Sequence, residues 1–156
     1  MSQFGHAHEL TDLYQEVIIE HSKHPRNFKK LDNATHTAEG FNPLCGDQIT
    51  IYAAVSENQI SEIGFLGDGC AISKASASLM TSAVKGKSFA EAISLFESFR
   101  SLLIGGENAK SEKEKLGKLA ALSGVSEFPM RVKCATLAWH TLKNALEQKG
   151  AASTEE

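Results

Sequence analysis

The sequence predicts an α+β fold in which a small antiparallel sheet of about three strands carries helices packed on one of its faces. Apolar and polar residues alternate from Gln48 to Val55 and again from about Gln59 to Leu66, which is typical of half-buried strands. Apolar residues recur at helical spacing on both sides of this region. The 156 residues contain no internal repeat or linker, so we expect one domain over 1–156 with flexible ends at 1–9 and 150–156.

Composition and charge exclude several classes of protein. Apolar residues make up 42% and charged residues 22% of the chain, as in ordinary globular proteins. The formal net charge of −3 argues against general nucleic-acid binding, which requires clustered lysines and arginines to neutralise phosphates. No apolar run approaches the roughly 20 residues that span a membrane, and no secretory signal is evident. We therefore expect a cytoplasmic protein that binds neither nucleic acid nor membrane.

The N-terminal part of the chain predicts one helix and one weak strand. Apolar residues follow a single helical stripe from Leu10 to Ser22. Pro25 ends this helix, because proline lacks the backbone N–H that a helix needs. A weak alternation from Ala34 to Gly40 predicts a short edge strand, and Gly40 to Gly46 predicts a loop.

The two clear strands are joined by the short turn Ser56 to Asn58, so they form an antiparallel hairpin. In such a pair the start of the first strand lies beside the end of the second strand. The loop that carries Cys45 and the loop that ends at Cys70 are therefore expected to be neighbours in space. Alternate residues of the second strand are expected to share one face: Ser61, Ile63 and Phe65.

The second half of the chain predicts three further helices. Small and apolar residues recur at helical spacing from Cys70 to Gly86, and Ser88 to Glu91 forms a capping box that starts the next helix. Glu107 to Lys118 is polar and predicts an exposed loop with a helical turn. Ser123 to Pro129 predicts a second loop, and Arg131 to Gln148 predicts the last helix. The middle helix has an inward stripe of large apolar residues: Phe89, Ile93, Phe96 and Phe99.

Three cysteines and one aspartate form the candidate site. Cys45 and Asp47 lie two residues apart, and the hairpin brings Cys70 near them. Cys70 and Cys134 both fall at predicted helix N-termini, where unpaired N–H groups and the helix dipole favour the thiolate. Three thiolates and a carboxylate suit a tetrahedral zinc ion, and the same set suits an iron–sulfur cluster. Because a dispersed cysteine is commonly a small buried core residue, spacing alone leaves that interpretation open as well.

Five stretches of the chain carry a resemblance to a known family. They are Leu13-Tyr14 through His24-Pro25-Arg26-Asn27, Asn42-Pro43-Leu44-Cys45-Gly46-Asp47, Gly67-Asp68-Gly69-Cys70, the Ser- and Ala-rich helix ending Val84-Lys85-Gly86-Lys87, and Arg131 to Trp139. Together, over roughly Leu10 to Leu146, they resemble the IscU/NifU-N family of iron–sulfur cluster assembly proteins. The resemblance implies that family's α+β fold and one metal site shared by Cys45, Asp47, Cys70 and Cys134.

Within that family the chain resembles the SufU branch more than the scaffold branch. Scaffold proteins place a histidine immediately before the third cysteine, where this chain has Lys133. The SufU branch has an extra segment before the last helix, matched here by about Gly105 to Ser126, and an arginine where Arg131 stands. The resemblance implies a tightly bound zinc ion and a partner, a SufS-type pyridoxal-phosphate cysteine desulfurase that hands over sulfane sulfur. Cys45 matches the sulfur acceptor, and we hypothesise that Arg131 steers the anionic persulfide or supports Asp47.

Three functions stay open on the sequence. In the first, the chain is a zinc-dependent sulfurtransferase that takes persulfide sulfur from the desulfurase and passes it to downstream iron–sulfur assembly proteins. In the second, it is a scaffold on which an iron–sulfur cluster is built and then transferred to apo-proteins. In the third, zinc only stabilises a small interaction domain. The ligand set permits all three, while Lys133 and the extra segment favour the first.

Overall fold

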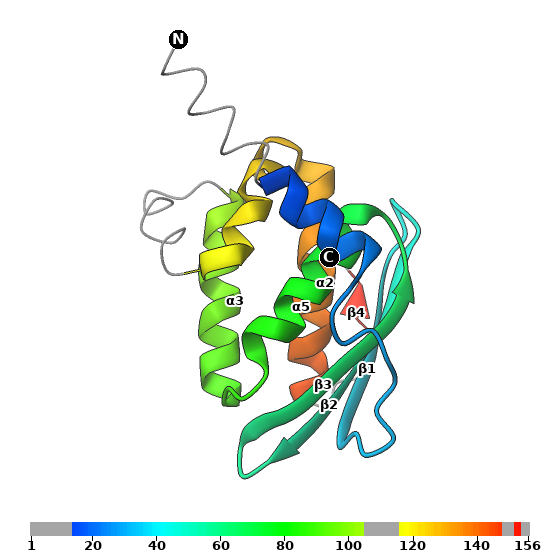
Figure 1. Cartoon of the computed structure of the whole chain (residues 1–156), viewed down its shortest axis with the longest axis vertical. Coiled ribbons are helices and arrows are strands. Elements are labelled where there is room, and N and C mark those ends of the chain that lie inside the picture. Colours follow the sequence, from blue (N-terminus) through cyan, green and yellow to red (C-terminus); the bar gives the residue numbers. More distant parts are fainter. Residues whose placement is uncertain (1–13, 105–115, 148–151, 154–156) are drawn as a thin grey trace.

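The computed structural model describes residues 14–104, 116–147 and 152–153. Three antiparallel strands form the main part of its sheet: β1 (His36–Asn42), β2 (Asp47–Ser56) and β3 (Gln59–Asp68). The strand order is β3-β2-β1-β4, and β4 (Ala152–Ser153) runs parallel to β1. The predicted antiparallel sheet of about three strands is confirmed (Figure 1).

Helices cover one face of this sheet, as predicted (Figure 1). They are a helix at residues 14–23, α2 (Ala71–Val84), α3 (Phe89–Ile104), the 3-10 helix η1 (Gly117–Glu127) and α5 (Pro129–Leu146). α5 packs on β1, β2 and α2, while α3 packs on α5 and η1. Among the described residues, no helix combines the length and the hydropathy needed to cross a membrane.

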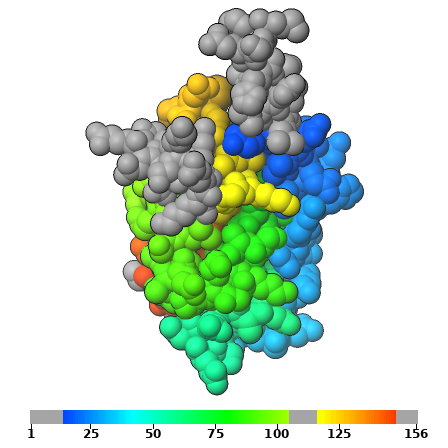
Figure 2. All heavy atoms as spheres, turned by 60° about the vertical axis from the view of Figure 1, so that its left-hand side comes forward, coloured from blue at the N-terminus to red at the C-terminus, as the bar shows by residue number. Residues whose placement is uncertain are grey.

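The core is built around Trp139 of α5, which is almost completely buried. Its ring stacks between two phenylalanines of α3, with centroid distances of 5.7 Å to Phe96 and 5.2 Å to Phe99. The predicted inward stripe of α3 is therefore present, although Phe89 and Ile93 are only half-buried. The space-filling view shows a closely filled surface over α3, with the turn between β2 and β3 projecting at its lower end (Figure 2).

The capping box at the start of α3 is also confirmed. The Ser88 N–H donates to Glu91 Oε1 at 3.0 Å, and the Glu91 N–H donates to Ser88 Oγ at 3.1 Å. Hydrogen bonding from the Ser88 backbone, followed by that from its side chain, lowers the pKa of the Glu91 carboxyl. The reciprocal pair satisfies two N–H groups that would otherwise lack a partner at the helix start.

A buried histidine ties the helix at residues 14–23 to α2. His21 Nδ1 lies 2.7 Å from Ser78 Oγ, and the Arg26 N–H donates to the same oxygen at 2.8 Å. Burial, followed by the positive charges of Arg26 and Lys118, lowers the pKa of His21, so the neutral ring is favoured in the fold. This tie holds the N-terminal helix beside α2.

The face assignment of β3 was partly wrong. Ile63 and Phe65 face the core as predicted, but Ser61 is exposed and Ile60 is buried in its place. The cause is a bulge: Ala54 pairs with Glu62 and Val55 pairs with Ile60, so Ser61 has no partner across the ladder. Its hydroxyl instead donates to the Ala54 carbonyl at 2.9 Å.

Two other segments differ from the prediction. The predicted loop from Ser123 to Pro129 is mostly helical, because η1 continues to Glu127 and α5 begins at Pro129, where proline is favoured. A 3-10 turn lacks the 3.6-residue period that reveals an α-helix. β4 lies within the tail that was expected to be flexible, where it pairs with β1 through its backbone. A strand of two residues is too short to show an alternating apolar pattern in the sequence. The prediction for Glu107 to Lys118 falls largely outside the described residues.

Candidate metal centre

Three of the predicted ligands meet at one point of the fold. Single ligand atoms of Cys45, Asp47 and Cys134 all lie within 4.8 Å of one another. The Cys134 thiol donates to Cys45 Sγ at 3.3 Å, although the two residues are 89 positions apart in the sequence. Cys134 and Asp47 are buried, whereas Cys45 is partly exposed.

The turn between β1 and β2 positions Cys45. Asn42 and Asp47 form the last pair of the β1–β2 ladder, and residues 43–46 connect them. The Cys45 N–H donates to the Asn42 carbonyl at 3.3 Å, which closes the turn. Gly46 takes a φ of +71°, a left-handed conformation that glycine adopts without steric cost. The turn therefore presents Cys45 at the end of the sheet while Asp47 starts a buried strand.

Asp47 connects this turn to the start of α2. Its Oδ1 accepts a hydrogen bond from the Cys70 N–H at 2.9 Å. A side chain on Gly69 would displace the Asp47 carboxylate, because a Cβ there would lie 2.5 Å from the same oxygen. Glycine before Cys70 thus lets the backbone approach the carboxylate, and the predicted proximity of the two cysteine loops is confirmed.

Cys70 lies at the rim of the site rather than inside the group of three. It is the N-cap residue of α2, and its Sγ accepts a hydrogen bond from the Ser73 N–H at 3.4 Å. The predicted place of Cys70 at a helix N-terminus is therefore confirmed. The same prediction for Cys134 was wrong, because α5 begins earlier than expected, at Pro129, and Cys134 lies in its second turn. Coordination of a metal by the four predicted residues stays a prediction.

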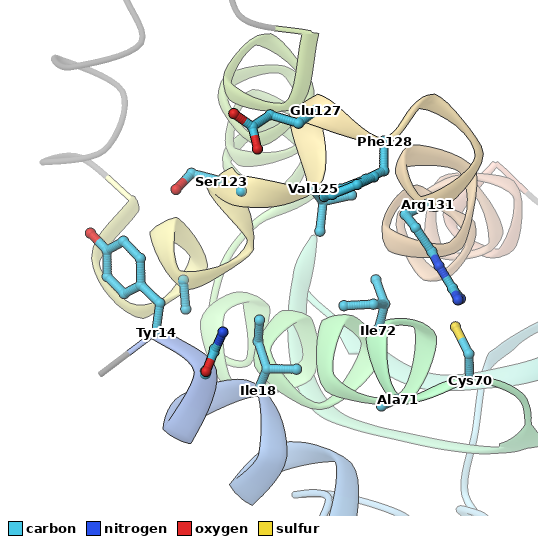
Figure 3. A pocket seen from close by; sticks show the side chains of 13 residues that line it. Tyr14, Ile18, Cys70, Ala71, Ile72, Ser123, Val125, Glu127, Phe128 and Arg131 are labelled. Carbon is cyan, nitrogen blue, oxygen red and sulfur yellow. The ribbon is translucent and has the colours of Figure 1, made fainter. Parts of the chain in front are cut away.

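Arg131 faces the cysteines from the first turn of α5. Its side chain is exposed and points toward the Cys70 sulfur (Figure 3). The negative charge of a Cys70 thiolate, followed by a hydrogen bond with Cys134, raises the pKa of the guanidinium. The arrangement gives the partly exposed sulfurs a fixed positive neighbour.

The buried thiol of Cys134 is protonated when no cation is present. Burial raises the pKa of Cys134 most, and hydrogen bonds with Asp47 and Cys45 raise it further. A bound cation would reverse this preference, since metal ligation by a thiol displaces its proton. Thiolate and carboxylate donors suit zinc, and a tetrahedral ion with bonds of about 2.0–2.3 Å needs donor atoms about 3.3–3.8 Å apart. The sulfur atoms of Cys45 and Cys134, at 3.3 Å, have such a separation.

Asn42 is a functional candidate that the sequence analysis missed. It is fully buried, and its Nδ2 donates to Asp47 Oδ2 at 3.3 Å and to Cys134 Sγ at 3.5 Å. Its Oδ1 has no hydrogen-bond partner among the described residues. The sequence contained a signal for this residue. Alternate residues of β1 face the core, namely Ala38, Gly40 and Asn42, so the polar side chain of Asn42 occupies a core position.

The fold and the site together define a small α+β domain in which two thiols and a carboxylate meet at one potential metal position and a third thiol lies at its rim. The chain matches the NifU-like N terminal domain family over residues 13–148. It therefore belongs to this family of iron–sulfur cluster assembly proteins.

Individual relatives include members of two branches. The chain is 43% identical to the iron–sulfur cluster assembly scaffold protein IscU of Streptococcus pyogenes, covering 92% of this chain and 89% of the relative. It is 41% identical to the zinc-dependent sulfurtransferase SufU of Bacillus subtilis, covering 94% of each chain. Among solved structures, an assembly scaffold protein for the SUF system from Fervidobacterium islandicum superposes with a TM-score of 0.78 at 36% identity, covering 84% of this chain and 94% of that one. The similarity to SufU proteins supports the SufU branch.

Replacing Asn42 by leucine should weaken zinc binding about 10–100-fold, as loss of a group that orients metal ligands typically does. Leucine fills a similar volume but cannot donate to Asp47 or to Cys134. The measurement is zinc affinity by competition with a coloured chelator. Gln48→Leu is the matched control, because Gln48 neighbours Asp47 but is exposed. Equal zinc affinity in Asn42→Leu and the wild type would contradict the positioning role of Asn42.

Proposed function

We propose that this chain is a zinc-binding sulfur acceptor in cytoplasmic iron–sulfur cluster assembly. It takes sulfane sulfur from a SufS-type cysteine desulfurase and passes it to downstream assembly proteins. The proposal depends on one observation, the meeting of Cys45, Asp47 and Cys134 with Cys70 and Arg131 beside them. Lys133 in place of a histidine and the similarity to the Bacillus subtilis sulfurtransferase support the same choice.

Cys45, Asp47, Cys70 and Cys134 would hold the zinc ion. When bound, zinc keeps its cysteine ligands deprotonated and adds no redox chemistry of its own. The chain orients the carboxylate in advance, because the Cys70 N–H and the Asn42 amide each donate to one oxygen of Asp47.

Cys45 is the side chain best placed to receive sulfur. It is more exposed than Cys134, and it lies in a turn, whereas Cys70 is held at the start of α2 by the Ser73 N–H. The Cys45 thiolate attacks the outer sulfur of the donor's persulfide, and the donor's S–S bond breaks. The electron pair of that bond returns to the donor cysteine as a thiolate. Cys45 then carries the persulfide, so the exchange needs no further oxidant or reductant.

Arg131 attracts the incoming persulfide, which is anionic. Its guanidinium lies beside Cys70, the residue at the rim of the site (Figure 3). We therefore expect an approaching donor to pass it. A fixed positive charge in that place raises the local concentration of an anionic reactant.

A scaffold function is the second candidate. The same three thiols and one oxygen donor suit a nascent iron–sulfur cluster, and the Streptococcus pyogenes relative carries the scaffold name. A scaffold and a sulfur acceptor differ in what they carry as purified and in what they deliver to a recipient.

The test is to purify the chain without added metal and incubate it with its desulfurase and cysteine. We expect about one zinc per chain, no visible absorbance, and a persulfide that mass spectrometry locates on Cys45. The persulfide should be lost in Cys45→Ser, while Cys70 stays unmodified in both proteins. A coloured protein that donates a cluster to an apo-protein would favour the scaffold instead. A persulfide on Cys70 in the wild type would contradict the role given to Cys45.

Replacing Arg131 by alanine should slow sulfur transfer from the desulfurase about 10-fold or more, because the persulfide loses its electrostatic attraction. Zinc content should not change. Arg131→Lys, which keeps the charge, should recover part of the rate, and Lys133→Ala serves as a matched control two residues away. The rate is measured by single-turnover labelling with cysteine that carries radioactive sulfur. Transfer by Arg131→Ala at the wild-type rate would remove this role.

A further inference from the structure

A pocket of about 1030 Å³ opens beside the metal centre. It lies between the helix at residues 14–23, the start of α2, η1 and the start of α5 (Figure 3). Cys70 and Arg131 belong to its lining, but Cys45 and Cys134 do not. The pocket therefore leads from the surface toward the exposed side of the proposed site.

The lining has an apolar middle and a cationic end. Ile18, Ile72 and Val125 contribute aliphatic surface from three different elements, and Figure 3 shows these side chains directed into the pocket. Phe128 adds an aromatic ring that is 59% exposed. Arg131 supplies the positive charge where the pocket meets Cys70.

The size of the pocket indicates what could occupy it. Sites for drug-sized ligands measure about 300–1,000 Å³, so this pocket, at about 1030 Å³, has room for a peptide segment together with an anionic group. An apolar middle suits a segment with apolar side chains, and the guanidinium suits an anion at the end of that segment. An extended peptide that presents an anionic sulfur matches both requirements.

We propose that this pocket is the docking groove for an apolar segment of the sulfur-donating protein, whose persulfide anion is received at the Arg131 end. The inference rests on the proposed function and adds the surface through which the donor is recognised. A groove that ends at Cys70 and Arg131 brings the donor's persulfide to the edge of the site, from which Cys45 is reached. It also accounts for the exposure of Phe128, which a seated partner would cover.

Gly124 offers a way to fill the groove without disturbing the fold. It lines the pocket, its φ is not in the left-handed region, and a Cβ added there meets nothing within 4 Å. Gly124→Trp therefore places a large side chain in the groove and leaves the metal ligands and Arg131 intact. Ser94→Trp on the exposed face of α3 is the matched control.

The experiment measures sulfur transfer to zinc-loaded protein from the desulfurase and, separately, from inorganic polysulfide. Gly124→Trp should raise the half-saturating concentration of the chain for the desulfurase about 10-fold or more. Its labelling by polysulfide, which needs no groove, should match the wild type, as should both rates in Ser94→Trp. Thermal unfolding of both variants checks that they are folded.

These outcomes distinguish a failure of the proposed groove from a failure of the proposed function. Unchanged transfer from the desulfurase to Gly124→Trp, with transfer to the wild type intact, overturns the groove alone. A wild-type chain that takes no sulfur from the desulfurase overturns the proposed function and the groove with it. A photo-crosslinker at position 124 should attach to the desulfurase near its persulfide cysteine, and attachment to a second copy of this chain would contradict the proposal.

Discussion

The structure of the site depends on one buried carboxylate that joins separate parts of the fold. Asp47 begins β2, its Oδ1 accepts the Cys70 N–H at the start of α2, and its Oδ2 accepts the Asn42 amide at the end of β1. The same amide reaches Cys134 on α5. Because burying an unpaired carboxylate is costly, these contacts stabilise the arrangement of the loops that carry the thiols. The contacts of this one carboxylate and its amide partner thus connect β1, β2, α2 and α5 at the site.

The three cysteines differ in their exposure to solvent. Cys134 is buried and anchors the site to α5, whereas Cys45 lies in a turn that closes with a single weak backbone hydrogen bond of 3.3 Å. Cys70 stands between the site and the groove, with Arg131 beside it. A buried inner side and a more open outer side are what the proposed sulfur acceptor needs, since it would keep its metal while one sulfur takes part in exchange.

Most of the fold, and the proximity of the Cys45 and Cys70 loops, could be predicted from local patterns. The approach of Cys134 could not, because it depends on how α5 packs on the sheet. Alternation revealed β2 and β3, and antiparallel pairing of these two strands was enough to predict that the Cys45 and Cys70 loops are neighbours. The bulge that exposes Ser61 could not be predicted, because one extra residue in β3 reverses which side chains face the core while the composition of the strand stays the same. Predicting the role of Asn42 would have required the register of β1. Predicting the groove would have required the packing of η1, whose 3-10 turns lack the period of an α-helix.

The central claim is that four side chains from separate parts of the chain share one zinc ion. X-ray absorption at the zinc edge, on protein purified without added metal, tests it most directly. The account predicts three sulfur neighbours and one oxygen neighbour, with one sulfur lost in each of Cys45→Ser, Cys70→Ser and Cys134→Ser. A wild-type spectrum with two sulfur neighbours or fewer would contradict it.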